Sequence, residues 1–228
     1  LSANSVMRGR LDARRTLKSL VADLRSNIKL IYNGFTAISQ QIYPYIYSGK
    51  INILFAGRFV PQKGIPVLIN IIKRVDEKVF YFHKAGKGPL EEIILQELGN
   101  KSNVRITPPI FSLAQYLSSF DYVFIPSEHE GLNSLSIESS INKVPVIIND
   151  IDGLNETLPQ NYPLKVKNNC IDEYMTLFTD VIPTIDRVSL IDSVYQYSCQ
   201  KFDIQQMQKQ YEYIYKTGKK YGCFFHEK

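Results

Sequence analysis

Residues 126–138 read Pro126-Ser-Glu-His-Glu130-Gly-Leu-Asn-Ser-Leu-Ser-Ile-Glu138. They follow the apolar run 122–125, which is typical of a buried strand, and they lead into 134–141, which predicts the first turns of a helix. Asn133 or Ser134 is available as the N-cap of that helix. A strand, a tight loop and a helix in this order expose free backbone N–H groups at the helix N-terminus. We therefore expect an anion site between this strand and this helix.

Two carboxylates bracket this anion site, Glu130 in the loop and Glu138 within the first helical turns. Both would repel a bare phosphate, but an ionised carboxylate accepts the hydrogen bonds that the hydroxyl groups of a sugar donate. A phosphate held by the backbone, with a carboxylate on either side, describes a nucleotide sugar. The simpler alternative is a helix start whose acidic residues interact favourably with the helix dipole.

A second strand–loop–helix pattern lies upstream, between residues 51 and 75. The apolar run 51–56 predicts a buried strand, and Pro66 marks the start of a helix that continues through 67–75. The loop between them reads Gly57-Arg58-Phe-Val-Pro-Gln-Lys63-Gly64.

This second loop carries the residues that a diphosphate needs. Gly57 permits a sharp turn and Gly64 permits a close backbone approach. Arg58 and Lys63 place two cations in one loop, a planar fork and a compact point charge. The loop is not a Walker motif, because glycine rather than serine or threonine follows the lysine. The alternative is a solvated basic loop.

In these segments the chain resembles the C-terminal, donor-binding domain of the retaining glycosyltransferases of family 4, which have the GT-B architecture and are also called group 1. The resemblance extends through residues 103–127, through Phe82-His-Lys-Ala-Gly86-Lys-Gly88-Pro-Leu-Glu-Glu92, and beyond Glu138 to Gly153-Leu-Asn-Glu156. Order and spacing agree over about 110 residues. The resemblance implies an α/β fold with a Rossmann-like parallel sheet, helices on both of its faces, and helical segments at the N- and C-terminal ends of the chain.

The resemblance also implies roles for individual residues. Arg58 and Lys63 match the basic pair that steadies the departing diphosphate, and Glu130 matches the glutamate that contacts the transferred sugar, so these three are the implied catalytic residues. Glu138 matches the glutamate that binds the nucleotide ribose. The other implied substrate-binding residues are Gly57 and Gly64, Pro108 and Ile110 against the base, and Leu132, Asn133, Ser134 and Leu135, whose backbone N–H groups would hold the phosphates.

Two short stretches depart from the family pattern. Residues 131–133 read Gly-Leu-Asn where the family usually has Gly-Phe-Gly, and residues 142–144 read Asn-Lys-Val where a small residue and a glycine are usual. These departures leave the identity of the sugar open.

The same resemblance divides the chain into three parts. Residues 1–45 match the tail of a missing N-terminal domain with the crossover and linker, 46–182 match the nucleotide-sugar-binding domain, and 183–228 are expected to form C-terminal helices. Arginines and lysines crowd near the start of the chain, where a helix would be basic and partly amphipathic. That helix either touches an anionic membrane peripherally, at its cytoplasmic face, or packs as an ordinary surface helix.

Composition narrows the classes further. The 228 residues carry a formal net charge of +5, no apolar run approaches the ~20 residues of a membrane span, and nothing reads as a signal peptide. The three cysteines, Cys170, Cys199 and Cys223, are scattered, which favours a reduced, cytoplasmic setting over a disulfide framework. No fold signature of a nucleic-acid-binding protein accompanies the charge, so nucleic acid is not expected as a partner.

No metal site is predicted. Asp150-Ile-Asp152 has the spacing of the metal motif of the other major glycosyltransferase architecture, but it follows a strand beyond the helix that carries Glu138, and we interpret it as a chance turn. Cys223 and His226 lack two further zinc ligands at suitable spacing.

We expect metal-free transfer, with retention, of a sugar from a nucleoside diphosphate sugar, UDP being favoured, to a glycan or lipid-linked acceptor. No cofactor besides this donor substrate is expected. The resemblance implies that the acceptor binds mostly on the missing N-terminal domain, so this chain alone would bind the donor and transfer little. Two alternatives stay open: a non-catalytic nucleotide-sugar-binding or interaction domain, and another GT-B enzyme such as a non-hydrolysing epimerase.

Overall fold

The computed structural model describes residues 30–217 of the chain. These residues divide into two compact units, one of residues 30–34 with 204–217 and one of Phe35–Asp203. The basic segment near the N-terminus and its expected membrane contact lie outside the described residues, as do Cys223 and His226.

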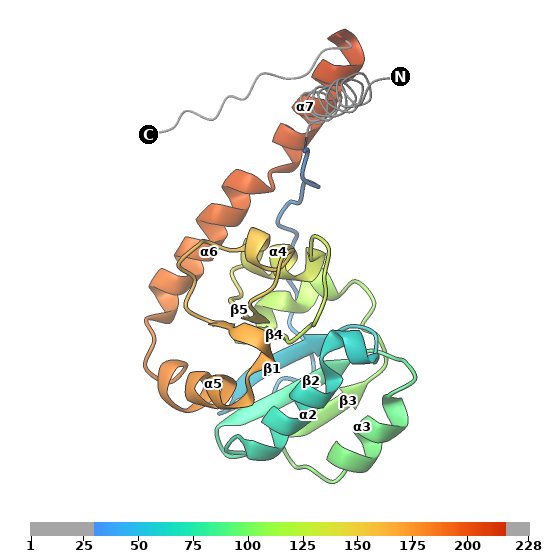
Figure 1. The fold of residues 1–228 in the computed structure, drawn as a ribbon, viewed down its shortest axis with the longest axis vertical. Coiled ribbons are helices and arrows are strands. Elements are labelled where there is room, and N and C mark those ends of the chain that lie inside the picture. The colour runs from blue at the N-terminus through green and yellow to red at the C-terminus, as the bar shows by residue number, and fades with distance from the viewer. Residues whose placement is uncertain (1–29, 218–228) are drawn as a thin grey trace, which may run out of the picture. The chain divides into compact units, whose positions relative to one another are not determined.

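The larger unit is built on one parallel sheet (Figure 1). Its six strands lie in the order β3-β2-β1-β4-β5-β6. The strands are β1 (Ile51–Ala56), β2 (Phe80–Ala85), β3 (Val104–Thr107), β4 (Tyr122–Ile125), β5 (Val146–Asn149) and β6 (Lys165–Val166). Most of their apolar residues are buried, as expected for a parallel sheet that is covered on both faces, and only the edge strand β3 has none fully buried. The predicted α/β fold with a parallel sheet is confirmed.

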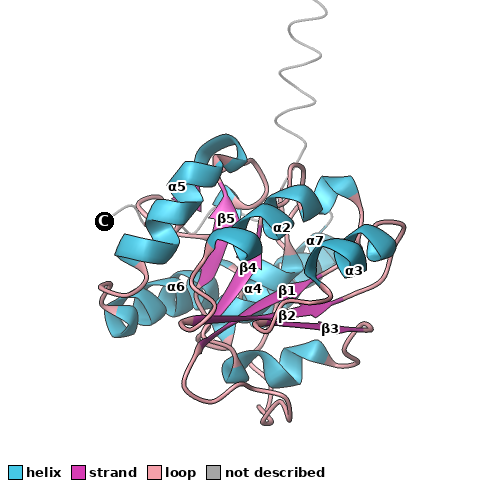
Figure 2. Ribbon diagram, turned by 90° about the horizontal axis from the view of Figure 1, so that it is seen from below, coloured by secondary structure: helices cyan, strands magenta, loops and turns pink. Residues whose placement is uncertain are grey.

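Helices and 3-10 turns connect the strands and cover both faces of the sheet (Figure 2). The α-helices of this unit are α2 (Ile65–Arg74), α3 (Glu91–Leu98), α4 (Ser134–Ile141), α5 (Ile171–Thr176) and α6 (Arg187–Lys201). The 3-10 segments are η1 (Pro61–Lys63), η2 (Leu113–Ser119), η3 (Asn155–Thr157) and η4 (Lys167–Asn169), and a π-helical turn, η5 (Leu177–Val181), follows α5.

Side chains that alternate along β2 show how the two faces are covered. Phe82 packs against Phe178, which follows α5, with ring centroids 6.0 Å apart. His83, the next residue, points to the opposite face and packs against Phe120 and Tyr43. Because successive strand residues face opposite sides, the segments around Phe178 and Phe120 form separate layers.

Several predicted boundaries agree with the structure. The strands at 51–56 and 122–125 begin and end at the expected residues, and the helix predicted after the second of them begins at Ser134. The helix predicted to continue through 67–75 spans Ile65–Arg74 instead, because Gly64 serves as its N-cap and Pro66 is accommodated in its first turn.

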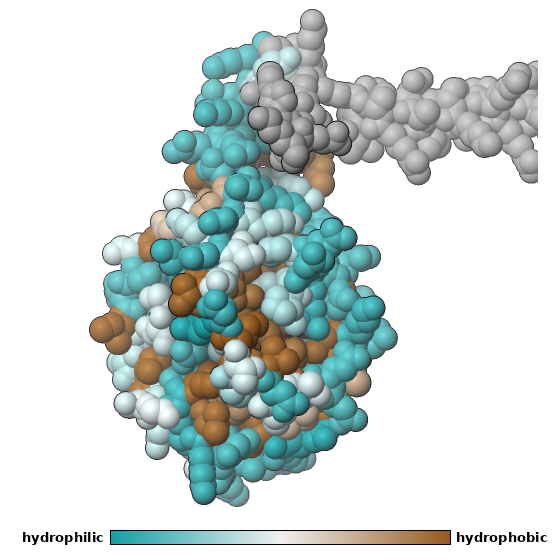
Figure 3. All heavy atoms as spheres, turned by 90° about the vertical axis from the view of Figure 1, so that its left-hand side faces the viewer, coloured by the Kyte–Doolittle hydropathy of each residue, from teal (hydrophilic) through white to brown (hydrophobic). Residues whose placement is uncertain are grey.

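The described part of the smaller unit contains residues 30–34 and helix α7 (Ile204–Thr217). Gly34 lies so close to the start of α7 that a Cβ atom there would overlap the backbone of Ile204. Within the described residues, no helix is long and apolar enough to cross a membrane. On the face drawn in Figure 3, hydrophilic residues surround the apolar ones.

Candidate functional site

The loop after β4 ends in a capped helix start. Asn133 has an extended backbone, and its side-chain oxygen accepts a hydrogen bond from the backbone N–H of Ser136 at 2.9 Å. Asn133 is thus the N-cap, one of the two residues predicted for that position. The first N–H groups of α4, at Ser134 and Leu135, have no acceptor in the preceding turn and are available to an anion.

The loop after β1 lies directly against the loop after β4. Gly64 has a φ of 69°, and a Cβ atom there would overlap the carbonyl oxygen of Pro126. Glu128 donates its backbone N–H to the carbonyl of Gln62 at 2.9 Å, and the Gln62 side chain donates to the carbonyl of His129 at 3.0 Å. The close approach predicted at Gly64 is therefore an approach to the neighbouring loop.

Contact between the loops brings two of the three candidate catalytic residues together. Lys63 Nζ donates to Glu130 Oε1 at 2.6 Å, and the two side chains are only 23% and 10% exposed. Gly153 packs against the backbone of Glu130, and a Cβ atom at Gly153 would come within 2.5 Å of the carbonyl oxygen of Glu130. Sequence reasoning placed both residues at the site but did not predict that they form an ion pair.

Two adjoining cavities open beside this ion pair. The smaller, of about 190 Å³, is lined by Lys63, Glu130 and the start of α4. The larger, of about 500 Å³, lies between the ends of β1, β2 and β3 and is lined by Arg58, Ile110 and Glu138 among others. Ala56, Ser134 and Leu135 line both cavities, so the two meet at the N-terminus of α4.

Most of the predicted site residues line these cavities. Gly57, Arg58, Ile110 and Glu138 line the larger, Lys63, Glu130, Leu132 and Asn133 the smaller, and Ser134 and Leu135 both. Pro108 is exposed and lines neither cavity, whereas Pro109 lines the larger one. Gly64 is buried under the loops rather than facing a cavity.

Glu138 is half-buried on the wall of the larger cavity. Burial raises the pKa of its carboxyl group, because the ionised form loses hydration. A carboxylate in such a place gains from hydroxyl donors, which replace the lost water.

The loop after β2 contributes residues that sequence reasoning passed over. Lys87 lines the larger cavity together with Arg58 and Gly86. Cβ atoms at Gly86 and Gly88 would overlap the carbonyl oxygen of Gly57 and come within 2.7 Å of Phe59 backbone atoms. The Gly-Lys-Gly spacing was the available signal, since only glycine allows this approach.

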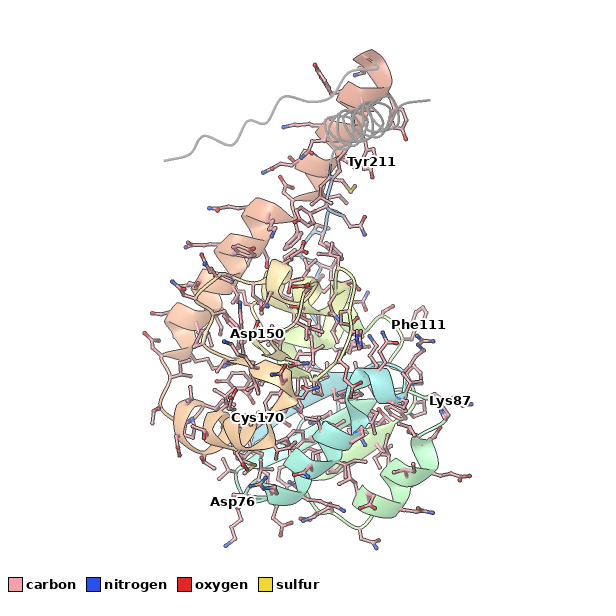
Figure 4. All side chains as sticks on the ribbon, viewed as in Figure 1. Asp76, Lys87, Phe111, Asp150, Cys170 and Tyr211 are labelled. Atoms are coloured by element: carbon pink, nitrogen blue, oxygen red, sulfur yellow. The ribbon has the colours of Figure 1, made fainter. Side chains whose placement is uncertain are left out.

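Within residues 30–217 no group of three or more histidine, cysteine, aspartate or glutamate side chains could hold a metal ion. Asp150, labelled in Figure 4, accepts a hydrogen bond from the side chain of Asn155 five residues later. This contact is local to the turn after β5.

Comparison with known proteins agrees with the family resemblance that the sequence motifs indicated. The profile of the family described as Glycosyl transferases group 1 matches residues 50–179. The uncharacterized glycosyltransferase MJ1178 of Methanocaldococcus jannaschii is 31% identical over 162 residues, which are 64% of this chain and 42% of the relative. The D-inositol 3-phosphate glycosyltransferase of Jonesia denitrificans is 32% identical over 117 residues, 45% of this chain and 27% of the relative. The chain thus spans less than half the length of these relatives.

Solved structures share the fold. Anabaena HepE, in complex with UDP and glucose, superposes with a TM-score of 0.71 at 17% identity, covering 83% of this chain and 56% of HepE. A TarM variant from S. aureus, in a complex that contains UDP, gives a TM-score of 0.70 at 18% identity, covering 86% of this chain and 42% of TarM. At these identities the likeness establishes the fold alone.

Proposed function

The chain belongs to the group 1 (family 4) glycosyltransferases and forms the C-terminal portion of their GT-B fold, and from this premise we propose that it binds a nucleoside diphosphate sugar, with UDP favoured. One observation carries the proposal: two cavities meet at the N-terminus of α4, each with a carboxylate on its wall. HepE and TarM, whose folds match, have each been solved with UDP, which supports uridine as the nucleoside.

The two cavities suit different parts of the donor. The larger has an apolar wall at Pro109 and Ile110 for a flat base, and Glu138 to accept hydrogen bonds from ribose hydroxyls. The diphosphate would lie at the shared boundary, on the N–H groups of Ser134 and Leu135. The transferred sugar would then occupy the smaller cavity beside Glu130.

The proposed chemistry is retaining transfer without a metal. The bond from the anomeric carbon to the diphosphate oxygen breaks, and both electrons leave with the diphosphate. The acceptor hydroxyl oxygen bonds to the same face of the sugar, and its proton passes to the departing diphosphate. Arg58, Lys63 and the α4 N-terminus stabilise the charge that develops on the diphosphate. The Lys63–Glu130 ion pair holds the ammonium group in place before the donor arrives, so little reorganisation is needed.

The acceptor, a glycan or a lipid-linked molecule, is proposed to bind mostly to an N-terminal half outside this chain. The greater length of the relatives supports this division, in which the present chain binds the donor and transfers little by itself. Scattered cysteines support a cytoplasmic setting as part of the same proposal.

Calorimetric titration of the 228-residue chain with UDP, GDP and their sugars, with and without EDTA, tests the proposal. UDP should bind, and the affinity should be unchanged by EDTA because the cations of the site are side chains. Failure of every nucleoside diphosphate to bind would overturn the donor-site assignment, and loss of binding in EDTA would overturn the metal-free mechanism alone.

A further inference from the structure

The charged side chains around the two cavities nearly cancel one another. Their walls carry three cationic side chains, Arg58, Lys63 and Lys87, and two carboxylates, Glu130 and Glu138. Lys63 is already paired with Glu130 at 2.6 Å. Without Lys87 the two cavities together would carry no net charge, although a nucleoside diphosphate brings at least two negative charges to them.

The position of Lys87 is set by the backbone around it. Its carbonyl accepts a hydrogen bond from the N–H of Phe59 at 3.0 Å, which ties it to the loop that carries Arg58. Gly86 and Gly88, on either side, lie against Gly57 and Phe59 without room for a Cβ atom. The side chain of Lys87 therefore starts at a fixed point on the rim of the larger cavity.

Lys87 also has a free ammonium group. It is exposed, and neither Lys87 nor Arg58 forms an ion pair with any residue of the part of the chain that the structure describes. Lys87 projects outward after β2, on the side of the molecule where Phe111 follows β3, whereas Asp76, before β2, lies at the other end of the sheet (Figure 4). The group can therefore turn toward an anion in the cavity without breaking an existing contact.

We propose that Lys87 is a third cation of the donor site, a binding residue that contacts the phosphates of the nucleoside diphosphate and offsets the two carboxylates. The inference rests on the proposed function. Arg58 and Lys63 only balance the charges of the two carboxylates, so the negative charge of the diphosphate needs a further cation, which the loop after β2 supplies. The contact between Lys87 and the diphosphate should affect the affinity for the donor, because the negative charge of the diphosphate is present before any bond breaks.

Binding of UDP and UMP to the 228-residue chain and to Lys87→Met, Lys87→Arg and Lys87→Glu tests the proposal. We expect UDP affinity to fall about threefold to tenfold in Lys87→Met, to fall further in Lys87→Glu, and to be nearly kept in Lys87→Arg. UMP, with less charge, should lose less than UDP. In about 0.5 M NaCl the difference between the unsubstituted chain and Lys87→Met should shrink, because salt screens an exposed contact.

Lys78→Met is the matched control. Lys78 is also exposed and also flanks β2, but it precedes the strand and lines neither cavity, so it makes the same change of net charge at the other end of the sheet. UDP binding that is equal in Lys87→Met and the unsubstituted chain, or weakened equally by Lys87→Met and Lys78→Met, overturns the role of Lys87 and leaves the donor site standing. If the unsubstituted chain binds no nucleoside diphosphate, the proposed function is overturned and this inference with it.

Discussion

Lys84 lies near the end of β2 with its side chain fully buried. Its Nζ atom has no hydrogen-bond partner among the described residues and lies 5.6 Å from the centre of the Phe59 ring. Burial lowers the pKa of this amine from 10.5 to about 7, because the interior disfavours the charged form. At the scale of a single residue, this lysine therefore destabilises the folded state at every pH at which the amine is protonated in the unfolded chain.

We expect Lys84→Met to stabilise the fold, because methionine fills a similar volume without an amine. The unfolded chain keeps this proton up to about pH 10.5, whereas the folded chain releases it near pH 7. Between these values the unfolded state binds more protons, so the stability of the unsubstituted chain rises with pH and the advantage of Lys84→Met shrinks. Urea unfolding at about pH 6 and about pH 9 should show an advantage of about 2–4 kcal/mol at the lower pH.

The exposed Lys78→Met should leave stability unchanged at both pH values. An advantage of Lys84→Met that does not depend on pH would show that packing, and not the amine, determines its effect.

The two cations of the β1 loop should each contribute to donor binding. Arg58→Ala and Lys63→Ala are expected to weaken UDP binding about tenfold or more, since a charge-assisted hydrogen bond contributes ~1.5–3 kcal/mol. Calorimetry measures the affinities, and a thermal melt of each variant checks that it is folded. If the folded variants bind UDP with the original affinity, the alternative holds, in which Arg58 and Lys63 belong to a solvated basic loop without a role in binding.

The two glutamates should divide the donor between them. Glu138→Ala should weaken UDP and UDP-sugar alike, because both ligands contain the ribose. Glu130→Ala should remove any preference for UDP-sugar over UDP, because Glu130 is proposed to contact the transferred sugar, which UDP lacks. Binding constants of the two ligands for each variant decide the matter. Equal weakening of both ligands by Glu130→Ala would contradict this division.

At the scale of elements, the site depends on how three loops pack. The loop after β1 lies against the loop after β4 at Gly64 and Pro126, and against the loop after β2 at Gly57 and Gly86. A Cβ atom at Gly64 would overlap Pro126 and one at Gly86 would overlap Gly57, whereas a Cβ atom at Gly57 itself would have room. Gly64 and Gly86 therefore set the distance between the side chains that line the two cavities.

Gly64→Ala should damage both the fold and the site. The residue has a φ of 69°, and the added methyl group would overlap the carbonyl of Pro126, so the two loops must separate. We expect a loss of about 2 kcal/mol or more in stability, measured by urea unfolding, and weaker UDP binding. Gly131→Ala is the control from the same pair of loops, because its Cβ atom would meet nothing within 4 Å. Equal loss of stability in both variants would contradict the packing argument.

At the scale of the whole molecule, the strand order explains where the site lies. The sheet continues from β1 to β2 and β3 on one side and to β4, β5 and β6 on the other. The loops after β1 and β4 therefore meet at the point where the order reverses, which is where open parallel sheets bind ligands. All residues that line the two cavities lie within 35–203, the larger compact unit.

A chain of residues 35–203 should therefore fold and bind UDP as tightly as the 228-residue chain does. Its core and its cavities are complete without the smaller unit. Circular dichroism and calorimetry of the two chains test this. A folded 35–203 chain that binds UDP much more weakly would assign part of the donor site to the smaller unit.

The sequence by itself determined the elements of this protein. Short runs of apolar residues predicted the strands at 51–56 and 122–125, and a capping asparagine marked the start of the helix at 134. Each of these signals is local, because it lies within a few residues of the element that it predicts. The order and spacing of the motifs indicated the family, and the profile match over residues 50–179 confirms it.

Only the tertiary structure decided which side chains meet. Lys63 and Glu130 are 67 positions apart, and their ion pair depends on the packing of Gly64 under Pro126. Lys87 joined the site for the same reason, because its loop lies against Gly57 and Phe59. Local patterns carry no record of such contacts, since the distance between two loops is set by the sheet beneath them and by the space that their backbones leave to each other.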